Sequence, residues 1–300
     1  MSLLVVGSIA LDTLDTPAGR REDCLGGSAV HFSLAARHFV KPRLVGIVGE
    51  DFPPQHIELL RRCGVDVAGV AVQPGGRTFR WSGRYRGDLQ EAETIDLQLN
   101  VFENYQPVVP EAWRDSDFVF LANGSPVTQL AVRRQLPEAR FVMADSMNHW
   151  IASAREDLLR LIGEVHALIL NHTEAVMLAR TPNLVAAARA ILEWGPQILI
   201  VKKGEHGASL FARGRTFSLP AFPLEQVVDP TGAGDSFAGG VMGSLAQADT
   251  VDWRQLKRAL LYGTVVASYG VEDFGTARHE RLTRGEIEAR AQMLREMATL

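Results

Sequence analysis

The 300-residue sequence contains little cysteine and no long hydrophobic run. Its two cysteines, Cys24 and Cys63, are too few for a disulfide framework or a cysteine-rich zinc site, so we expect free thiols in a reducing compartment. No stretch of 18 apolar residues occurs, and the apolar N-terminus lacks the basic residues of a signal peptide. These absences argue against a disulfide-stabilised secreted domain and against a membrane protein, and they predict a cytoplasmic location.

The sequence also has no large excess of charge of either sign. Its 31 lysines and arginines and 35 aspartates and glutamates give a net charge of −4. A protein that binds nucleic acid through a positive surface needs an excess of basic residues, so we predict no nucleic-acid partner. An anionic ligand would have to bind at a local site.

The order of the predicted elements indicates an α/β fold. Short β-branched or continuous apolar runs predict strands, and longer periodic segments between them predict helices. The expected strands are residues 3–9, 44–48, 65–72, 118–121, 141–144, 165–170 and 198–201, with a hairpin at 208–211 and 216–219; the expected helices are 28–38, 52–63, a short one after Pro126, 150–162, 173–179, 184–194, 234–246, 252–268 and 283–298. This alternation predicts one domain, residues 1–300, with a doubly wound, mostly parallel sheet covered by helices on both faces.

Two segments interrupt the alternation. Residues 12–24 are polar and predict a loop or a short flap strand, and residues 77–102 contain two runs with a period of two, 78–85 and 94–101. We interpret the two segments as a small antiparallel β-lid, and an edge hairpin without function is the alternative. Arg80, Arg84 and Tyr85 could contact substrate from this lid, but the pattern does not encode which of them face the site.

A glycine turn within residues 228–240, Val-Asp-Pro-Thr-Gly-Ala-Gly-Asp-Ser-Phe-Ala-Gly-Gly, carries the strongest functional signal. Backbone N–H groups at a glycine turn and a helix start can bind an anion, and Asp235 would lie beside the bound charge. An acid there suits a base that takes a proton from an attacking hydroxyl. A simple tight helix entry is the alternative. The turn is not a Walker A loop, because the chain contains no Gly-Lys pair, and Phe237 occupies the third glycine position of the dinucleotide fingerprint.

Residues 229–237 closely resemble the C-terminal signature of the PfkB (ribokinase-like) carbohydrate and nucleoside kinases, D-T-x-G-A-G-D-x-F. Further motifs similar to those of that family occur in order: Gly-Gly at 26–27 before a small-residue helix, Val-Gly-Ile-Val-Gly-Glu-Asp at 45–51 with Gly-Val-Asp at 64–66, Asn-His-Thr-Glu at 171–174, and Val-Lys-Lys-Gly-Glu-His-Gly-Ala at 201–208. The resemblance runs from Leu3 to about Gly275. It implies a ribokinase-like fold and a kinase that uses ATP and Mg²⁺.

The resemblance implies a role for each matching residue. Asp235 is implied to be the base that deprotonates the acceptor, and the anion hole for the transferred phosphoryl group is implied to be the amides of Gly232, Ala233 and Gly234. The implied substrate contacts are Asp12, Gly26 and Gly27. The nucleotide would be bound by Asn171, Lys203, Gly204, Gly207, Asp229, Thr231 and Gly275, and Mg²⁺ would be organised, mostly through water, by Glu174.

Two positions depart from the family pattern. Where relatives often carry an asparagine that touches the sugar, this chain has His31, which is either a substrate contact altered for a different ligand or a packed helix histidine. In many relatives the loop equivalent to 271–275 carries Arg or Lys and helps to frame a monovalent-cation site with the equivalents of Asp229 and Thr231. The acid in the loop of this chain argues against such a site.

Two further polar residues follow predicted strands. Asp145 could lie near phosphates or metal, or it could be the N-cap of the helix that follows it. Asn123, which follows the strand at 118–121, has a similar status.

We therefore predict ATP-dependent phosphorylation of a hydroxyl on a small sugar or sugar-like polyol. A nucleoside kinase acting on a ribose hydroxyl is the first alternative, and Phe102, Tyr85 and Trp81 are then candidates for stacking on the base. A non-catalytic ligand-binding sensor on the same fold is the second, against which the intact Asp235 argues. The open edge of the lid also suggests a homodimer formed through it.

Overall fold

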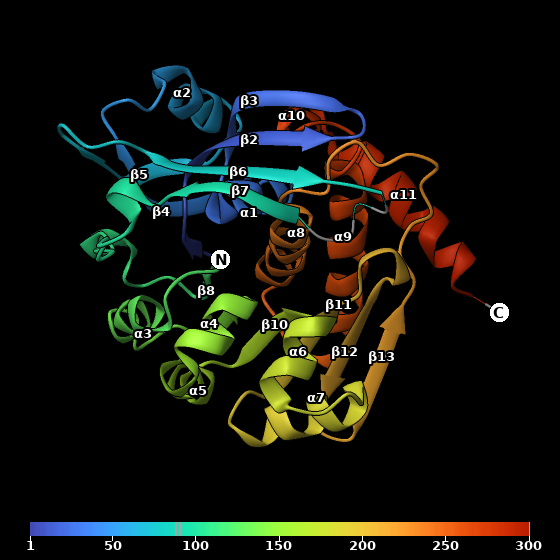
Figure 1. Cartoon of the computed structure of the whole chain (residues 1–300). Coiled ribbons are helices and arrows are strands. Elements are labelled where there is room, and N and C mark those ends of the chain that lie inside the picture. Colours follow the sequence, from blue (N-terminus) through green and yellow to red (C-terminus); the bar gives the residue numbers. More distant parts are fainter. Residues whose placement is uncertain (88, 90–91, 300) are drawn as a thin grey trace.

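The structure, a computed structural model, describes residues 1–87, 89 and 92–299 and is built around a nine-stranded sheet (Figure 1). The strand order is β13-β12-β11-β10-β9-β8-β1-β4-β5, and only the pairs β11–β12 and β12–β13 are antiparallel among the pairs described. The bounds are β1 (Leu3–Val6), β4 (Pro42–Gly49), β5 (Asp66–Gln73), β8 (Phe118–Leu121), β9 (Phe141–Asp145), β10 (Ala167–Asn171), β11 (Ile198–Lys202), β12 (Ala208–Ala212) and β13 (Arg215–Leu219). The predicted mostly parallel sheet is confirmed.

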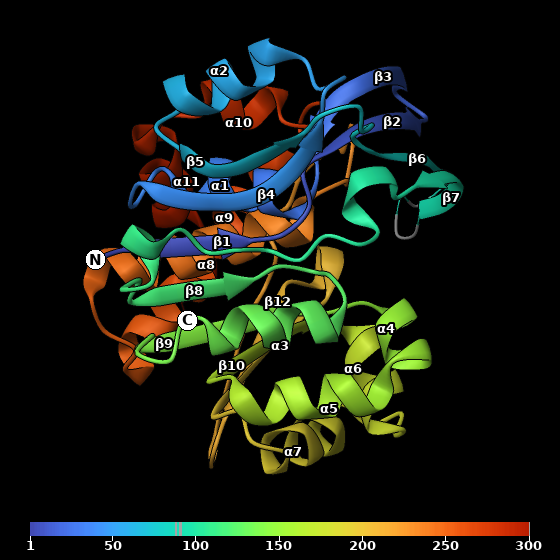
Figure 2. The same cartoon turned by 90° about the vertical axis from the view of Figure 1, so that its left-hand side faces the viewer.

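Helices cover both faces of this sheet (Figure 2). One face packs against α1 (Ser28–Ala36), α8 (Ala233–Ala248) and α9 (Trp253–Gly270), and the other against α3 (Pro126–Arg134), α5 (Arg155–Glu164), α6 (His172–Ala179) and α7 (Leu184–Glu193). Leu3 and Val5 belong to the first hydrophobic cluster, and Leu4 and Val6 belong to the second. The strands are therefore continuously apolar, because alternate side chains enter two different cores.

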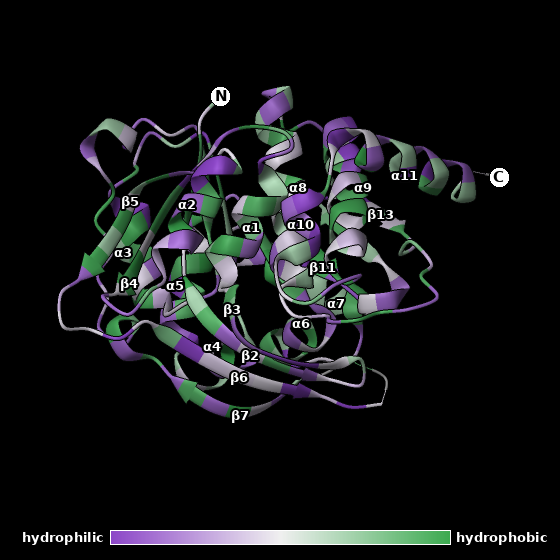
Figure 3. Cartoon of the chain, turned by 90° about the horizontal axis from the view of Figure 1, so that it is seen from above, coloured by the Kyte–Doolittle hydropathy of each residue, from purple (hydrophilic) through white to green (hydrophobic). Residues whose placement is uncertain are grey.

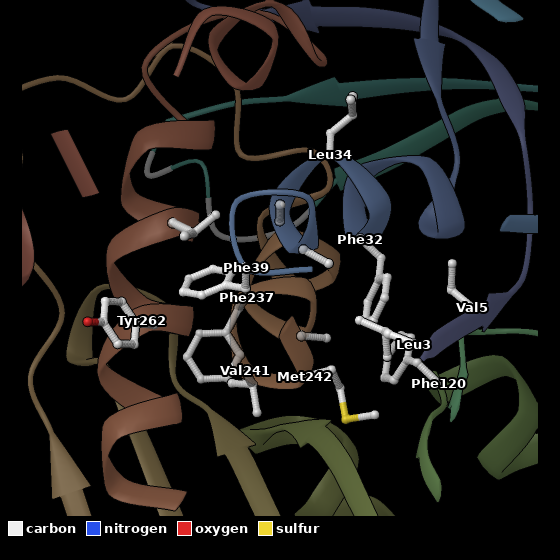
Figure 4. Close-up of a cluster of buried hydrophobic side chains, with 14 of the residues drawn as sticks. Leu3, Val5, Phe32, Leu34, Phe39, Phe120, Phe237, Val241, Met242 and Tyr262 are labelled. Carbon is white, nitrogen blue, oxygen red and sulfur yellow. The ribbon is translucent and has the colours of Figure 1, made fainter. Parts of the chain in front are cut away.

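Helix α8 is held tightly between α1 and α9 by its glycines. A Cβ added to Gly239 would lie 2.3 Å from the carbonyl oxygen of Phe32, and one added to Gly240 would lie 2.9 Å from the Cα of Gly263. Beside this contact, the rings of Phe32 and Phe120 stack with their centroids 4.4 Å apart (Figure 4). The small residues that follow the glycine turn thus fix the position of the N-terminus of α8.

A second sheet of four strands, in the order β3-β2-β6-β7, lies at one end of the molecule, as the view in Figure 3 shows. Its strands are β2 (Ala10–Thr16), β3 (Gly19–Gly26), β6 (Phe79–Tyr85) and β7 (Ala92–Gln98). We call it the small sheet. It is built from the two segments predicted to form a lid, of which residues 88, 90 and 91 lie outside the described residues. Strands β2 and β6 are parallel, and the other two pairs are antiparallel.

The small sheet corrects two predictions. Residues 12–24 are not a loop or a short flap strand, because β2 and β3 pair from Ala10–Gly26 to Thr16–Gly19 around a tight turn. The predicted strand at 3–9 also ends early, at Val6, and the chain enters β2 at Ala10. Asp12 therefore lies on β2 of the small sheet and not at the carboxyl end of β1.

Three smaller differences concern helices and strand ends. The predicted helix at 150–162 is two helices, α4 (Asn148–Ser153) and α5, because Ala154 between them has a non-helical φ of −136°. The predicted strand at 94–101 stops at Gln98, and a 3₁₀ turn, η1 (Asn100–Phe102), follows, where Asn100 has a φ of +51°. The short helix α10 (Ala277–Arg281) was not predicted.

The remaining elements are α2 (Pro54–Arg62), α11 (Arg284–Met297) and the 3₁₀ turns η2 (Glu111–Trp113) and η3 (Gly204–His206). None of the described helices is by itself long and apolar enough to span a membrane; α6 and α7 meet that test only as a pair, with a 63° bend between them.

Candidate active site

The glycine turn opens α8 in the geometry that an anion site requires. Gly232 is the N-cap of this 16-residue helix and has a φ of +72°, a conformation that only glycine adopts without strain. The amide of Ala233 donates to the carbonyl of Pro230 at 3.1 Å. The amides of Gly232, Gly234 and Asp235 find no acceptor in the described part of the chain and remain available to a ligand at a helix N-terminus.

The turn is anchored to the loop at 271–275. Asp229 is 1% exposed and accepts hydrogen bonds from the amides of Thr231 at 2.9 Å and Gly275 at 2.8 Å. The amide of Val228 donates to the carbonyl of Val271 at 2.8 Å. Burial raises the pKa of Asp229, and these hydrogen bonds oppose the rise. Asp229 and Gly275 therefore hold two loops together, whatever contact they make with a nucleotide.

The acids of the 271–275 loop are neutralised by arginines. Glu272 pairs with Arg278 at 3.1 Å and with Arg290 at 2.6 Å, and Asp273 pairs with Arg281 at 2.7 Å. The negative charges of the two acids are therefore compensated by arginines of the C-terminal helices.

Asp12 and the two glycines predicted to contact substrate lie together. Asp12 is 4% exposed, and a Cβ on Gly26 would lie 1.9 Å from its Oδ2. Gly27 has a φ of +97°, and a Cβ there would lie 2.5 Å from the carbonyl oxygen of Ser8. Burial raises the pKa of Asp12 to about 8, and the negative charges of Asp229 and Asp235 add to the rise while a backbone hydrogen bond from Gly27 opposes it. The structure thus brings Asp12 into the field of the glycine turn.

His31 lies directly against that turn. It is 2% exposed, and a Cβ on Gly232 would lie 2.3 Å from its ring. Burial lowers its pKa to about 4, so the ring is neutral at pH 7. Neither ring nitrogen has a hydrogen-bond partner among the described residues. A packed histidine normally satisfies its polar atoms, so two unpartnered nitrogens favour a ligand contact over mere packing.

Asp235 lies in a group of four ionisable side chains that we call the acid–lysine cluster: Asp145, Glu174, Lys202 and Asp235. Burial raises the pKa of Asp235 to about 7, Asp145 adds to the rise, and Lys202 opposes it. The Nζ of Lys202 donates to Oδ2 of Asp145 at 3.1 Å. Lys202 enters this cluster because β11 pairs in register with β10, which places it beside Asn171. A carboxyl with a pKa near 7 is suited to take up a proton at neutral pH.

Asn171 and Glu174 form a capping box at the start of α6. The amide of Glu174 donates to Oδ1 of Asn171 at 2.8 Å, and the amide of Asn171 donates to Oε2 of Glu174 at 2.7 Å. Burial raises the pKa of Glu174 to about 7; the charge of Lys202 opposes the rise and that of Asp145 adds to it. Oε2 of Glu174 thus accepts a hydrogen bond at the helix cap, and the carboxyl group also interacts with the charges of the cluster.

The predicted nucleotide loop is a tight turn. Gly204 has a φ of +55°, and Gly207 has a φ of +85°, where a Cβ would lie 2.0 Å from the carbonyl oxygen of Leu219. The amide of Lys203 donates to the carbonyl of Gly207 at 2.8 Å, which closes the turn. The role of these residues toward a nucleotide stays a prediction.

Sequence reasoning missed Lys202 and left Asp145 undecided. Asp145 is not an N-cap, since α4 begins after Met147 without a side-chain cap, and its oxygens accept from Ser146 and Lys202. Lys202 could have been found as the polar residue that ends a buried strand. Asn123 donates to the sulfur of Met147 at 3.1 Å and leaves its Oδ1 unpartnered.

The side chains of the small sheet divide into two kinds. Arg80 pairs with Asp23 and Asp51, and Arg84 pairs with Asp15 at 2.7 Å, so both arginines bind within or beside the small sheet. Tyr85 instead reaches the glycine turn, where its hydroxyl accepts from Oγ1 of Thr231 at 3.1 Å. The small sheet therefore lies over the turn, with one direct hydrogen bond to it.

An apolar pocket lies at the carboxyl ends of β1 and β8. Its aromatic lining comes from three residues, Phe102, Tyr105 and Trp150. Gln129 also lines it; its Nε2 donates to three backbone carbonyls, those of Leu121, Ala122 and Asp145, and its Oε1 has no partner among the described residues. Of the three aromatic residues proposed to stack on a base, Phe102 lines this pocket, whereas Tyr85 bonds to the glycine turn.

Comparison with known proteins decides the family. The model of the pfkB family of carbohydrate kinases matches residues 17–281. This chain belongs to the pfkB carbohydrate kinase family. It is 30% identical over 249 residues to the cytidine kinase of Thermococcus kodakarensis, covering 81% of this chain and 87% of that one, and 32% identical over 258 residues to the fructokinase of Klebsiella pneumoniae, covering 81% and 83%.

The fold of this pfkB kinase is also that of solved relatives. The solved structure of the nucleoside kinase of Burkholderia thailandensis in complex with inosine aligns over 97% of both chains with a TM-score of 0.82 and 22% identity. The predicted family and ribokinase-like fold are confirmed, and the chain is an ATP-dependent phosphotransferase.

Proposed function

We propose that this pfkB kinase transfers the γ-phosphoryl group of ATP to a hydroxyl of a small sugar, sugar-like polyol or nucleoside, with Asp235 as the base. The observation that carries the proposal is the position of Asp235 in the first turn of α8, directly after the glycine turn and with a pKa near 7. Phosphoryl transfer needs mainly positioning and charge stabilisation, and this arrangement offers both.

In the proposed step, Asp235 accepts the proton of the acceptor hydroxyl as its oxygen bonds to the γ-phosphorus. The bond from that phosphorus to the bridging oxygen breaks, and its electron pair stays on ADP. The free amides of the glycine turn, those of Gly232 and Gly234, donate hydrogen bonds to the oxygens of the transferred group. Asp12 and His31 would orient the acceptor, because a carboxyl and a neutral imidazole can each bind hydroxyl groups.

The residues present fit a magnesium ion that is bound mainly by phosphates and water. No group of three or more His, Cys, Asp or Glu residues within the described ranges is arranged to hold a metal by itself. Mg²⁺ in kinases is usually held by one or two carboxylates together with phosphate oxygens, and Glu174 would supply such a contact. When bound, the ion would neutralise phosphate charge.

The apolar pocket favours a nucleoside as the acceptor. A base would rest against Phe102, Tyr105 or Trp150, and the unpartnered Oε1 of Gln129 could accept a hydrogen bond from an N–H group of the base. A free sugar has no apolar part that would fill this pocket. The sequence similarity to a cytidine kinase also supports a nucleoside acceptor, and the sequence similarity to a fructokinase supports a sugar as the alternative.

Acceptor-dependent release of ADP from ATP tests the proposal. The assay compares nucleosides, sugars and polyols at equal concentrations, with K⁺ and Na⁺ exchanged to test for a monovalent cation. We expect nucleosides to be the best acceptors and Phe102→Ala to raise their KM about 5-fold to 150-fold, because stacking on one base contributes about 1–3 kcal/mol. Sugars that react faster than nucleosides and are insensitive to Phe102→Ala would favour the alternative.

The same assay separates an enzyme from a sensor. Asp235→Asn should lower kcat by about 10²-fold to 10⁴-fold, which is the usual contribution of a general base, with ATP binding little changed. A protein that binds acceptor but releases no ADP with any of them would be a sensor, and near-normal kcat in Asp235→Asn would mean that another group is the base.

We also propose a homodimer formed through β7, the edge strand of the small sheet. All seven of its residues are exposed, including Ile95 at 47% and Leu97 at 53%, whereas the other edge strand, β3, carries charged residues at 20–23. An exposed edge with apolar side chains can pair with a second copy. Light scattering should give twice the chain mass, and Leu97→Lys should give the monomer; a wild-type monomer at micromolar concentration would contradict the dimer.

A further inference from the structure

Lys202 lies beside Gly234 of the glycine turn, whereas His31 lies beside Gly232. A Cβ added to Gly234 would lie 3.1 Å from the Nζ of Lys202, and the next closest atoms are its own Cδ and Cε at 3.6 Å. The lysine side chain is 17% exposed, so its charge lies largely out of bulk water. The ammonium group therefore forms one wall of the site where the free amide of Gly234 would meet a phosphoryl oxygen.

The ammonium group of Lys202 has N–H donors that are not used within the described part of the chain. A lysine carries three N–H donors, and the hydrogen bond to Oδ2 of Asp145 at 3.1 Å uses one of them. No other acceptor for this Nζ lies in the described part of the chain. Asp145 is itself 5% exposed and also accepts from the amide of Ser146, which fixes the carboxylate that orients Lys202.

Charge balance gives the second argument. Asp145, Glu174 and Asp235 bring three carboxyl groups around a single lysine, and the charge of Lys202 lowers the pKa of each of the three. A lysine that served only to neutralise Asp145 would be a poor source of stability, because burying an ion pair costs about as much as its attraction returns. A cation at an anion site gains a further partner when the phosphates bind.

We propose that Lys202 is a catalytic residue of the phosphoryl transfer, whose ammonium group donates a hydrogen bond to an oxygen of the γ-phosphoryl group, and that Asp145 is the residue that positions it. The inference rests on the proposed function of the glycine turn. Lys202 keeps its proton throughout: the acceptor oxygen bonds to the γ-phosphorus, its proton goes to Asp235, and the electron pair of the broken bond stays on ADP. The ammonium group stabilises charge on the group in transit.

The test compares Lys202→Met with the wild-type chain in two measurements. We expect kcat to fall about 10²-fold to 10³-fold, as when one donor to a transition state is removed. In binding titrations, the affinity for MgADP with aluminium fluoride, which mimics the group in transit, should fall at least about tenfold, while the affinity for MgADP alone should stay within about threefold. This binding result does not depend on knowing the acceptor, so it stands apart from a failure of the acceptor assay.

Lys41→Met is the matched control. Lys41 also pairs with an aspartate, Asp66, at 3.3 Å, but it is 67% exposed and precedes β4, which lies in the other half of the sheet from β11. It should change neither measurement. A kcat of Lys202→Met within threefold of the wild type, or equal losses of affinity for MgADP with and without aluminium fluoride, would overturn the proposal.

A second variant keeps the test valid if Lys202→Met does not fold because Asp145 is left unpaired. Lys202→Met with Asp145→Asn removes both charges together and avoids a buried, unpaired carboxylate. The same measurement then decides the proposal: a selective loss of affinity for MgADP with aluminium fluoride supports it, and the lack of such a selective loss contradicts it. Lys202→Arg should recover part of the selective affinity, because it restores a cation.

Discussion

Asp235 and Asp145 illustrate how neighbouring charges set the protonation of a single residue. Burial and the negative charge of Asp145 raise the pKa of Asp235 to about 7, and the positive charge of Lys202 opposes them. A base acts only when it is deprotonated, so the fraction of active enzyme should rise with pH until that pKa is passed.

The first prediction concerns this pH dependence. With saturating MgATP, log kcat/KM should rise with a slope of about one up to pH 7 and then level off. Asp145→Asn should move the rise to lower pH, because it removes a charge that disfavours the ionised form of Asp235. A rise caused by protonation of ATP would not move in that variant, and activity independent of pH between 5.5 and 8.5 would contradict Asp235 as the base.

The second prediction concerns the contact between Gly232 and His31. Gly232→Ala should destabilise the folded chain for two reasons: its φ is +72°, and its Cβ would lie 2.3 Å from the His31 ring. The left-handed backbone alone costs about 1–2 kcal/mol for a residue with a side chain. Chemical denaturation should show a larger loss, and the further change His31→Ala should recover the steric part. Without that recovery, the ring is not the obstacle.

At the scale of elements, a side-chain hydrogen bond between Tyr85 and Thr231 joins the small sheet to the glycine turn that opens α8. Tyr85 ends β6, and Thr231 immediately precedes the N-cap of α8. Gly19, at the turn between β2 and β3, also lies near Phe274: a Cβ added to Gly19 would be 3.8 Å from the ring of Phe274. A lid that closes over a phosphoryl-transfer site serves to exclude water.

The third prediction follows from this hydrogen bond. Tyr85→Phe should weaken the closure of the small sheet and raise ADP release in the absence of acceptor by a few-fold relative to turnover with acceptor. Thr94→Val is the matched control, because it removes a hydroxyl that accepts from Trp81 within the small sheet and not between the sheet and α8. Equal effects of the two variants would argue against a specific role for Tyr85.

The sequence predicted elements best where one physical signal dominated. The continuous apolar runs of the central strands and the helix that follows the glycine turn stand close to their predicted places. The strands of the small sheet were harder, because β2 and β3 contain charged residues and no long apolar run, and within the described residues they pair only with each other and with β6. Their pairing depends on tertiary contacts that no local pattern encodes.

The same limit applies to the site. Asp12, His31, Asp229 and Asp235 were named from the sequence, and the structure brings them to the glycine turn. From the sequence we named Lys203 and not its neighbour Lys202, because two adjacent lysines at a strand end differ only in the face to which their side chains point. The pairing of β10 with β11 determines which of the two lysines reaches the acid–lysine cluster, and that pairing depends on the whole sheet.

Across the whole molecule, two kinds of buried group control how stability changes with pH: carboxyls with raised pKa values and histidines with lowered pKa values. The folded chain holds the pKa values of Asp12, Glu174 and Asp235 near 7 or 8, well above those of exposed carboxyls. It lowers the pKa values of its buried histidines, that of His31 to about 4 and that of His279 well below its usual value. The histidines cost stability only where the unfolded chain would protonate them, below about pH 6.5.

Above pH 6.5 the carboxyls act alone, and the sign of their effect is fixed by linkage. Because their folded pKa values are raised, the folded chain binds more protons than the unfolded chain up to about pH 8, so the free energy of unfolding falls as the pH rises. This loss of stability begins at acid pH, where the carboxyls of the unfolded chain ionise, but there the histidines have the opposite effect and mask it. The effect of the carboxyls is therefore best measured between pH 6.5 and pH 8.5.

The fourth prediction is that the ligand-free chain melts at a lower temperature at pH 8.5 than at pH 6.5, and that Asp12→Asn flattens this dependence. Removing a carboxyl whose pKa is about 8 should raise the free energy of unfolding at pH 8.5 by on the order of 1–3 kcal/mol, or a few degrees in melting temperature. The control is Asp96→Asn on the exposed strand β7, which should leave the pH dependence unchanged. If Asp12→Asn melts lower than the wild type at pH 8.5, the buried carboxyl stabilises the fold, and the cost inferred from its burial and from the charges of Asp229 and Asp235 is wrong. If it melts higher, the free chain bears the cost of that buried charge, and a ligand that brings a cation or a hydrogen-bond donor to Asp12 can reduce it.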